Sequence, residues 1–222
     1  MSLKNVYCRA YQVCFAVGAR LLPWRRPECI TGLGSFARVP SLLAERGVRK
    51  PLIVASRRQS QTPAFQEMLG HLAGWSLYTG VTANPRVETV EAIAAQYRRS
   101  GCDGFVAVGG GSPMDAAKAA AALIARPGRT VAQLGGLLKV RCRVPPLVAV
   151  PTTAGTGSET TIAAVITGSD HHKYAINDLC LIPQAAVLDP ALSASLPQDV
   201  TAQTGMDALT HAVEAYIGRF YN

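Results

Sequence analysis

Short apolar segments alternate with helical segments through the middle of this chain of 222 residues, and this alternation constrains the fold more than any other feature. The apolar segments expected to form strands are residues 52–55, 75–81, 104–108 and 147–150. Helical patterns occupy residues 87–99 and an Ala-rich stretch at 113–125. Short, fully apolar strands connected by helices are typical of a parallel sheet covered on both faces. The sequence therefore predicts an α/β fold with a doubly wound, mostly parallel sheet.

The two ends of the chain follow less regular patterns. The first fifty residues begin with an amphipathic stretch, bend at Leu22-Pro23-Trp24, and pass through Gly32 to Gly34 into a helix expected to end near Gly47. After Pro190 the pattern is helical. Two more strands are expected at residues 163–167 and 185–188. The predicted domains are an α/β domain at residues 1–190 and the beginning of an all-helical domain at residues 191–222.

Composition excludes several classes of protein. The formal net charge is +8, but the cations are scattered in pairs such as Arg98-Arg99, without a basic run interleaved with aromatic residues, so no nucleic-acid partner is expected. Six dispersed cysteines form no C-x-x-C pair, which favours reduced thiols in the cytoplasm. The apolar stretch Tyr11–Leu22 is interrupted by Arg20 and is shorter than the roughly 18 to 20 residues that span a bilayer. With no signal-peptide pattern either, we expect a cytoplasmic protein with no membrane partner.

A glycine-rich loop, Gly109-Gly110-Gly111-Ser112, lies between a predicted strand and a predicted helix. Free backbone N–H groups and the positive end of the helix dipole converge at such a position, which favours an anion. Ser112 as N-cap, Pro113 as the first helical residue and Asp115 in the first turn would form a plausible helix start. Taken alone, the glycines are equally compatible with a tight turn that binds nothing.

A second loop strengthens the anion interpretation. Residues 151–159 follow the next strand and carry the hydroxyl groups of Thr152, Thr153 and Thr156. Two such loops at neighbouring strand ends indicate one ligand. The glycine loop matches neither G-x-G-x-x-G nor the Walker sequence, because Lys118 comes too late, so ATP hydrolysis is disfavoured.

Asp207 and His211 are four residues apart and lie on one face of a predicted helix. This spacing would allow both side chains to bind one divalent metal, but two ligands are too few for a tight site. From the helix alone, a solvated face with a hydrogen bond between the two residues is the simpler interpretation.

Taken together, these segments resemble the three consecutive signatures of the iron-dependent (group III) alcohol dehydrogenases, in the family's order and spacing. The segments are Gly109-Gly110-Gly111-Ser112-Pro113-Met114-Asp115-Ala116-Ala117-Lys118, Pro151-Thr152-Thr153-Ala154-Gly155-Thr156-Gly157-Ser158-Glu159 and Gly205-Met206-Asp207-Ala208-Leu209-Thr210-His211-Ala212-Val213-Glu214. Asn84-Pro85 resembles a further family element, so the resemblance extends from about Gly32 to the end of the chain. Dehydroquinate synthases and glycerol dehydrogenases share the fold, but the particular amino acids in the three segments argue against these two families.

The resemblance implies a dinucleotide-binding domain followed by a helical domain, with NAD or NADP and a divalent metal, Fe²⁺ or in some members Zn²⁺, in the cleft between them. It implies hydride transfer between the carbon of a small alcohol or aldehyde and the nicotinamide, with a homodimer left open. The implied cofactor-binding residues are Gly109, Gly110, Gly111, Ser112, Asp115, Thr152, Thr153, Thr156, Lys173 and Ser56. The implied metal ligands are Asp207 and His211.

The sequence departs from the family in its metal site. Family members add two further histidines from the helical domain, and this chain ends at Asn222 with its other histidines, His71, His171 and His172, outside that region. We therefore expect a truncated product or fragment that is inactive by itself, and a nucleotide-binding remnant without chemistry remains the alternative to an alcohol dehydrogenase.

A second departure lies at the end of the first predicted strand. Relatives that prefer NAD often carry an Asp there, and this chain has Ala55-Ser56-Arg57-Arg58. A missing acid followed by arginines is compatible with a 2′-phosphate, so NADP is at least as well supported as NAD, although the arginines are also compatible with a simple exposed surface.

Overall fold

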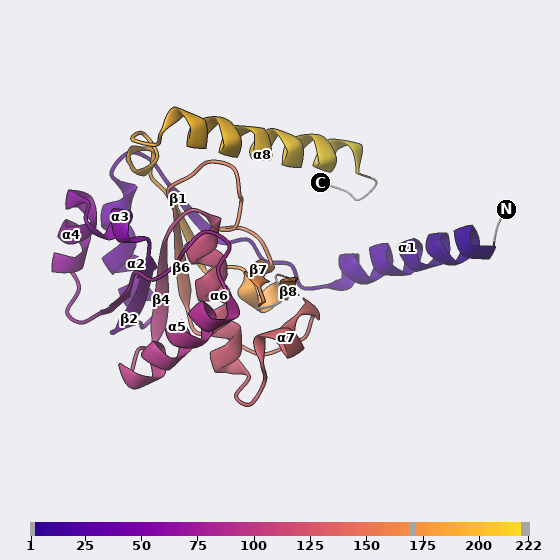
Figure 1. The fold of residues 1–222 in the computed structure, drawn as a ribbon, viewed down its shortest axis with the longest axis horizontal. Helices are drawn as coiled ribbons and strands as arrows, with labels where there is room; N and C mark the ends of the chain where they lie inside the picture. Colours follow the sequence, from indigo (N-terminus) through magenta and orange to yellow (C-terminus); the bar gives the residue numbers. More distant parts are fainter. Residues whose placement is uncertain (1–2, 169–171, 219–222) are drawn as a thin grey trace.

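A six-stranded parallel sheet forms the centre of the protein in the computed structural model, which describes residues 3–168 and 172–218 (Figure 1). Its strands stand in the order β1-β9-β6-β4-β2-β3, and each neighbouring pair is parallel. These strands are β1 (Glu28–Thr31), β9 (Ala185–Leu188), β6 (Leu147–Pro151), β4 (Gly104–Gly109), β2 (Pro51–Ala55) and β3 (Ser76–Tyr78). The predicted doubly wound α/β fold is thus confirmed.

Alternating side chains of the central strands enter two separate cores, one on each face of the sheet. Phe105 and Ala107 of β4 pack into the core beneath α5 (Val87–Arg99) and α6 (Gly111–Ala125). The intervening residues Val106 and Val108 pack into the core on the opposite face. That second core is covered by η1 (Ser35–Arg38), α2 (Val39–Glu45) and α4 (Pro63–Gly70). Because both faces are buried, the strands are apolar at every position, which is the pattern that the sequence shows.

Helix α6 packs closely against the sheet because its buried side chains are small. Ala116, Ala117, Ala119 and Ala120 are all fully buried. Methyl groups let the helix axis approach both the sheet and α5. The close approach fixes the start of α6 relative to the carboxyl ends of β4 and β6.

A second, three-stranded sheet lies beside the first. Its order is β5-β8-β7, with β7 (Ala163–Thr167) antiparallel to β8 (Lys173–Asn177) and β5 (Gly136–Leu137) parallel to β8. The predicted strand at 163–167 is confirmed, but it belongs to this smaller sheet. Strand β8 was not predicted, because its short sequence begins and ends with the polar residues Lys173 and Asn177, and only Ile176 of its five residues is buried.

The first fifty residues also contain a strand that the sequence did not predict. β1 pairs in parallel with β9 at the edge of the main sheet, from Glu28↔Ala185 to Thr31↔Leu188. Its short polar sequence shows no apolar run, and its position depends on partners more than 150 residues away. The expected helix ending near Gly47 is confirmed as α2, and Gly47 itself has a positive φ of 70°. The remaining short helices are α3 (Arg57–Ser60), α7 (Val131–Leu134), η2 (Leu179–Leu181) and η3 (Pro190–Leu192).

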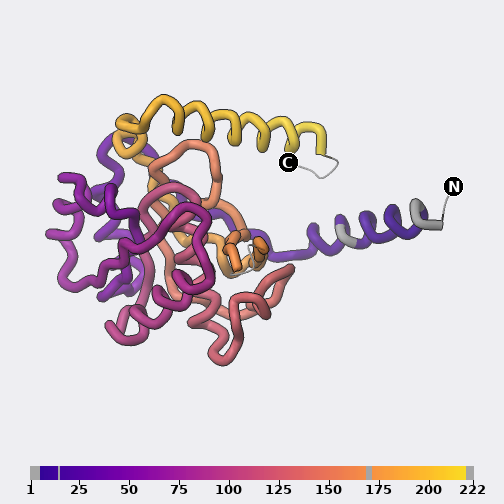
Figure 2. The backbone as a smooth tube through the Cα atoms, in the orientation of Figure 1, coloured from indigo at the N-terminus to yellow at the C-terminus, as the bar shows by residue number. Residues whose placement is uncertain are grey.

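Two long helices extend from the α/β domain. α1 (Leu3–Leu21) projects away from the domain, and α8 (Gln198–Ile217) lies across the upper side of it in the orientation of Figure 2. None of the described residues of α8 is buried. No helix in the described part of the chain is long and apolar enough to cross a bilayer. The predicted domain boundary at residue 190 remains a prediction.

Candidate functional site

The glycine loop and the threonine loop follow neighbouring parallel strands. Gly109 at the end of β4 is in register with Pro151 at the end of β6, and the backbone N–H of Thr152 donates to the carbonyl oxygen of Gly109 at 2.9 Å. Carboxyl ends of parallel strands are where open α/β sheets bind ligands. The predicted meeting of the two loops is therefore present in the structure.

Glycines 110 and 111 leave room that a side chain would fill. A Cβ atom on Gly110 would lie 3.4 Å from Oγ1 of Thr153, and one on Gly111 would lie 3.3 Å from Cγ2 of Thr156. Gly109 has a φ of +149°, in the region that side chains disfavour. The three glycines thus keep the backbone of the loop accessible and let it face the threonine side chains.

Helix α6 begins earlier than the sequence suggested. Gly110 is the N-cap, with extended φ and ψ of −77° and −162°, and the helix starts at Gly111. The prediction of Ser112 as N-cap is therefore wrong: Ser112 lies within the first turn. The glycine backbone adopts the cap conformation by itself, so no side-chain cap is formed. The first N–H groups of α6 remain without a side-chain acceptor at the point where a ligand would lie.

The hydroxyl group of Thr153 supports an anionic ligand. Its Oγ1 atom is buried and has no hydrogen-bond partner. The same atom faces Gly110 of the glycine loop. A buried hydroxyl without a partner is costly, and a ligand oxygen would satisfy it. The geometry of the loop therefore fits the pyrophosphate of a dinucleotide.

Lys118 connects α6, which follows the glycine loop, to the end of the threonine loop and the residues after it. This lysine is fully buried on α6, and its Nζ atom donates to oxygens of Ser158, Thr161 and Ala163, including the Thr161 carbonyl at 2.9 Å. Asp115, one turn earlier, accepts from Ser158 Oγ at 2.6 Å and from the backbone N–H of Val165 at 3.1 Å. These hydrogen bonds thus hold residues 158–165, at and after the end of the threonine loop, to α6, the helix that follows the glycine loop.

Burial shifts the pKa values of both charged groups in this network. Desolvation lowers the pKa of Lys118 to about 8, opposed by the neighbouring carboxylates of Asp115 and Glu159. Desolvation also raises the pKa of Asp115, opposed by its hydrogen bonds from Ser158 and Val165 and by the charge of Lys118. Both carboxylate oxygens of Asp115 accept hydrogen bonds that position residues 158–165, and its predicted contact with a cofactor stays a prediction.

The role of Lys118 was not predicted from the sequence, in which it was noted only as a lysine too late for a Walker loop. One signal was available: Lys118 stands in an otherwise small and apolar helix, three residues after Asp115, so both fall on one helical face. A lone lysine among alanines is buried only if acceptors surround it. Those acceptors come from residues 158–163, which sequence spacing does not place nearby.

A cavity of about 620 Å³ opens at the same edge of the sheet. It is lined by the start of α6 at Gly111 and Ser112, by Thr156 from the threonine loop, by Asn84-Pro85, and by His211 from α8. Residues from four separate parts of the sequence therefore meet around one space, and the imidazole of a predicted metal ligand is among them.

Asp207 and His211 lie together on α8, as the sequence predicted. Oδ1 of Asp207 is 3.9 Å from Nε2 of His211, and the two side chains are about half exposed, at 48% and 56%. An imidazole and a carboxylate are donors that both Fe²⁺ and Zn²⁺ accept. Among the residues that the structure describes, no group of three or more His, Cys, Asp or Glu side chains is placed to hold a metal.

Of the predicted cofactor-binding residues, four line this cavity: Gly111, Ser112, Asp115 and Thr156. The others are not among its lining residues: Gly109, Gly110, Thr152, Thr153, Lys173 and Ser56. Lys173 is an exposed residue at the start of β8, although its register partner Thr167 lines the cavity. Ser56 caps α3 at the end of β2, where its Oγ accepts from the backbone N–H of Gln59 at 3.3 Å. Arg57 and Arg58, which follow it, are exposed, and Arg58 donates to the carbonyl oxygen of Ser195 at 3.4 Å.

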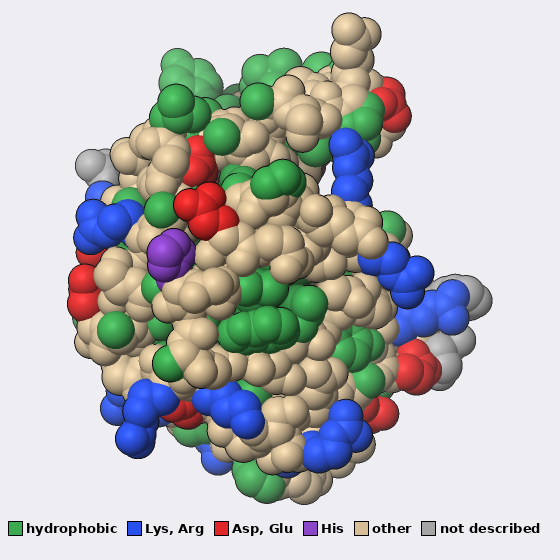
Figure 3. Space-filling model, turned by 90° about the vertical axis from the view of Figure 1, so that its left-hand side faces the viewer, with side chains coloured by type: hydrophobic (Ala, Val, Ile, Leu, Met, Phe, Trp, Pro, Cys, Tyr) green, Lys and Arg blue, Asp and Glu red, His purple; other side chains and the backbone are tan. Residues whose placement is uncertain are grey.

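Surface charge is distributed in separate groups. On the face shown in Figure 3, the Lys and Arg side chains stand apart from one another and form no continuous band. This distribution on the visible face agrees with the scattered cations of the sequence.

Several curated proteins resemble this chain in sequence. It is 38% identical over 194 residues to 4-hydroxybutyrate dehydrogenase of Cupriavidus necator, covering 85% of this chain and 51% of the relative. Lactaldehyde reductase of Escherichia coli is 36% identical over 194 residues, with the same two coverages. The chain thus spans about half the length of these relatives.

Solved structures resemble the fold as well. A 1,3-propanediol oxidoreductase superposes with a TM-score of 0.86 at 34% identity, covering 91% of this chain and 54% of that one. A sulfoacetaldehyde reductase from Bifidobacterium kashiwanohense, solved in complex with NAD⁺, superposes with a TM-score of 0.81 at 30% identity, covering 91% and 55%. The family model for iron-containing alcohol dehydrogenases matches residues 27–190, from β1 to the end of the main sheet. With the glycine loop, the threonine loop and the α8 histidine around one cavity, this chain belongs to the iron-containing alcohol dehydrogenase family.

Proposed function

We propose that this chain binds NAD or NADP at the carboxyl ends of β4 and β6, as the cofactor-binding part of an alcohol dehydrogenase or aldehyde reductase. The observation that carries the proposal is the pairing of Gly110 with Thr153, whose buried hydroxyl has no partner. In this proposal Gly109, Gly110, Gly111 and Ser112 hold the pyrophosphate through backbone N–H groups at the start of α6. The hydroxyls of Thr152, Thr153 and Thr156 contribute phosphate or ribose contacts.

The proposed chemistry is hydride transfer between a carbinol carbon and a nicotinamide ring. The cofactor supplies the hydride acceptor or donor, and a divalent metal supplies a Lewis acid for the alcohol oxygen. Asp207 and His211 would provide two ligands to that metal, and His211 already lines the cavity beside Gly111. Lys118 and Asp115 keep the threonine loop against α6. The proposed cofactor cradle, made of the glycine loop 109–112 and the threonine loop 151–159, is therefore formed before a ligand binds.

The substrate is proposed at the level of a class. The relatives are named for 4-hydroxybutyrate and lactaldehyde, and a solved neighbour for 1,3-propanediol, which are all small hydroxy or carbonyl compounds. A small alcohol or aldehyde is therefore the substrate class that we propose. A homodimer remains part of the proposal for the whole protein.

Cofactor binding is tested by replacing Gly110, where an added side chain would occupy the space proposed for a phosphate. Gly110→Ala places a methyl group in van der Waals contact with the Thr153 hydroxyl and reduces the space for a phosphate. We expect dissociation constants for NADH and NADPH, measured by fluorescence titration, to rise about tenfold to a hundredfold, because charge-assisted hydrogen bonds are lost. Gly70→Ala is the control, since its Cβ meets nothing within 4 Å. Unchanged affinity in Gly110→Ala would contradict the proposed cradle.

We propose that the site prefers NADP, because Ser56 stands where an acid would be expected and Arg57 and Arg58 can attract the 2′-phosphate. Arg57→Ala should weaken NADPH binding about tenfold and leave NADH binding nearly unchanged, because only the phosphate gains from the cation. Arg99→Ala, another exposed arginine, is the control. A wild-type preference for NADH would refute this part of the proposal.

We also propose that the 222-residue chain binds cofactor without turning over substrate. Asp207 and His211 supply two ligands, and further donors from the described residues do not join them. The test is oxidation of ethanol or butanol by the purified chain with added Fe²⁺ and NAD or NADP. Robust metal-dependent turnover would contradict this proposal and leave the cofactor site itself unaffected.

A further inference from the structure

Helix α1 lies outside the part of the chain that the family model matches, which begins at residue 27. It projects from the α/β domain, so most of its surface contacts no other element (Figure 1). The cofactor site and the metal ligands use none of its residues. This helix therefore has no role in the proposed function and needs an explanation of its own.

One side of α1 is apolar and exposed. Val6, Ala10, Val13, Val17 and Leu21 recur at intervals of three and four residues, so they form one stripe along the helix. Their exposure is high: Val13 is 63% exposed and Leu21 80%. Tyr7 and Tyr11 lie beside this stripe and are 73% and 62% exposed. Such an apolar face is costly in water and indicates a binding surface.

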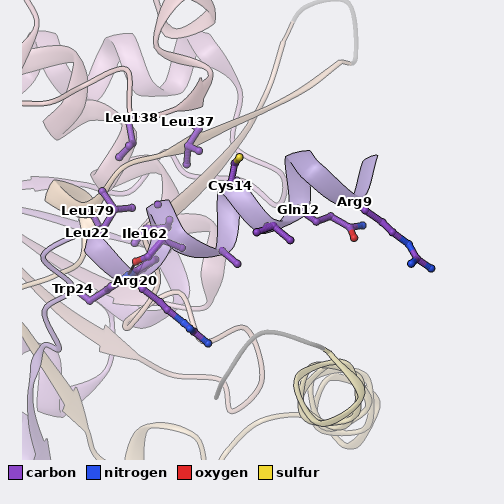
Figure 4. Close-up of a pocket in the computed structure, with 14 residues that line it drawn as sticks. Arg9, Gln12, Cys14, Arg20, Leu22, Trp24, Leu137, Leu138, Ile162 and Leu179 are labelled. Atoms are coloured by element: carbon purple, nitrogen blue, oxygen red, sulfur yellow. Dashed lines mark hydrogen bonds between the residues drawn. The ribbon is translucent and has the colours of Figure 1, made fainter. Parts of the chain in front are cut away.

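The charge of this segment has one sign. Residues 1–27 contain five cations and no Asp or Glu, although the chain as a whole contains 14 acidic residues. The cations are Lys4, Arg9, Arg20, Arg25 and Arg26. In the view of Figure 4, Arg20 and Cys14 extend from opposite sides of α1. The segment thus combines an apolar stripe with cations elsewhere on the helix, which complements an anionic and apolar partner.

A second apolar surface lies between α1 and the domain, and Val13 is the one residue of the stripe that lines it. Residues of α1 and its linker line a cavity of about 1260 Å³ together with Leu137, Leu138, Ile162 and Leu179 (Figure 4). Trp24, at the junction, is 54% exposed, and its ring nitrogen donates to the carbonyl oxygen of Ala19 at 2.6 Å. Tyr and Trp side chains with one apolar and one polar end are favoured at the boundary between lipid and water.

We propose that α1 is a surface anchor that lies along an anionic phospholipid bilayer. The stripe from Val6 to Leu21 would enter the boundary between headgroups and acyl chains, while Arg9 and Arg20 extend to the lipid phosphates. The expectation of no membrane partner considered only the length needed to cross a bilayer. A helix in the plane of the surface needs no such length.

Vesicle co-sedimentation of the 222-residue protein tests this proposal. Phosphatidylcholine vesicles should retain little protein, and vesicles that also contain phosphatidylglycerol should bind about tenfold more. Raising the salt concentration from about 0.1 M to about 1 M should reverse much of this difference, because the charges are exposed. Equal binding to both kinds of vesicle, or binding to neither, would overturn the proposal.

Two paired variants locate the surface. The double variant Arg9→Glu, Arg20→Glu should lose the preference for phosphatidylglycerol. The control double variant Arg99→Glu, Arg143→Glu makes the same change in net charge at exposed sites outside α1 and should retain the preference. Val13→Asp with Val17→Asp should also lose binding, while Leu33→Asp, an exposed residue outside α1, should keep it. Binding that survives both α1 variants would overturn the proposal.

Self-association is the competing explanation, since α8 is acidic and exposed and a second copy could cover α1 with it. Sedimentation velocity without lipid distinguishes the two. A dimer that is lost in Val13→Asp with Val17→Asp, without vesicle binding by the wild type, would identify the surface as an interface between copies and overturn the lipid proposal. NADPH affinity reports separately on the cofactor site, so either proposal can fail without the other.

Discussion

At the scale of single residues, Lys118 shows how a buried charge can hold two loops in place. Its ammonium group reaches oxygen atoms of three residues, and none of its side chain is exposed. A buried ammonium loses its hydration, and this cost is offset only while all of those acceptors stay in position. The lysine therefore specifies one arrangement of residues 158–163 relative to α6.

Removing the lysine should destabilise the domain substantially. Lys118→Met leaves the carbonyl oxygens of Ser158, Thr161 and Ala163 without their donor, and we expect the free energy of unfolding to fall by about 3–5 kcal/mol. Urea denaturation measures this loss. Lys139→Met, which alters an exposed lysine, should change stability by less than about 0.5 kcal/mol. Similar small effects for both substitutions would show that the buried network contributes little.

The lowered pKa of Lys118 predicts a specific pH dependence. The folded protein releases this proton near pH 8 and the unfolded chain near its ordinary value of 10.5, so the unfolded state binds more protons between these values. Stability contributed by this group therefore rises with pH across that interval. The difference in unfolding free energy between wild type and Lys118→Met should grow from about pH 8 towards pH 10.5. The difference between wild type and Lys139→Met should stay constant, and a flat difference for both variants would contradict the shift.

At the scale of elements, α8 approaches the threonine loop very closely at Gly155. A Cβ atom on Gly155 would lie 2.2 Å from the carbonyl oxygen of Thr204, a distance that no side chain tolerates. The glycine thus sets how closely α8, with Asp207 and His211, approaches the cofactor loop. This contact lies at Thr204, in the second turn of a helix that has no buried residue.

Substitution of that glycine should displace the helix. Gly155→Ala forces the backbone of α8 or of the loop to move, and we expect a loss of about 1–3 kcal/mol together with faster proteolysis within residues 198–217. Gly205→Ala is the matched control, because its Cβ meets nothing within 4 Å and alanine favours the helix interior by up to about 1 kcal/mol. Limited proteolysis with mass spectrometry compares the two. Equal cleavage rates would show that α8 is not held by this contact.

At the scale of the whole molecule, the chain contains a cofactor cradle from several elements and a metal-binding pair from one helix. The cradle uses β4, β6, α6 and the connecting loops, all held by two buried cores. Asp207 and His211 depend only on the spacing within α8 and stay about half exposed. The protein should therefore bind cofactor more firmly than metal.

This difference predicts weak metal binding by the 222-residue chain. Two donors on an exposed helix should give a dissociation constant for Zn²⁺ of roughly 100 µM or weaker, since tight sites have three or four protein ligands. At about 100 µM Zn²⁺ the gain in stability would be only about 0.4 kcal/mol. Titration calorimetry should show this weak binding disappear in His211→Ala and persist in His71→Ala. Tight one-to-one binding would indicate further donors.

Sequence alone determined the features that rest on local patterns. The central strands follow from short, fully apolar runs, and the helix at 87–99 follows from a periodicity of 3.6 residues. Their alternation along the chain indicated the doubly wound fold. The spacing of Asp207 and His211 fixed their common face through the same helical periodicity. Strand β1 could not be predicted, since its short sequence is extended because β9, more than 150 residues away, supplies hydrogen bonds. Strand β8 pairs with the nearby β7, but its five residues form no apolar run.

Tertiary structure decided the features that depend on contacts between distant segments. It placed the N-cap of α6 at Gly110, gave Lys118 its acceptors, and brought His211 to the cavity beside Gly111. It also left α1 outside the domain, with its apolar stripe exposed. Each of these outcomes depends on which groups meet after the chain has folded. Side-chain periodicity specifies the face on which a residue lies, and only packing specifies what that face contacts.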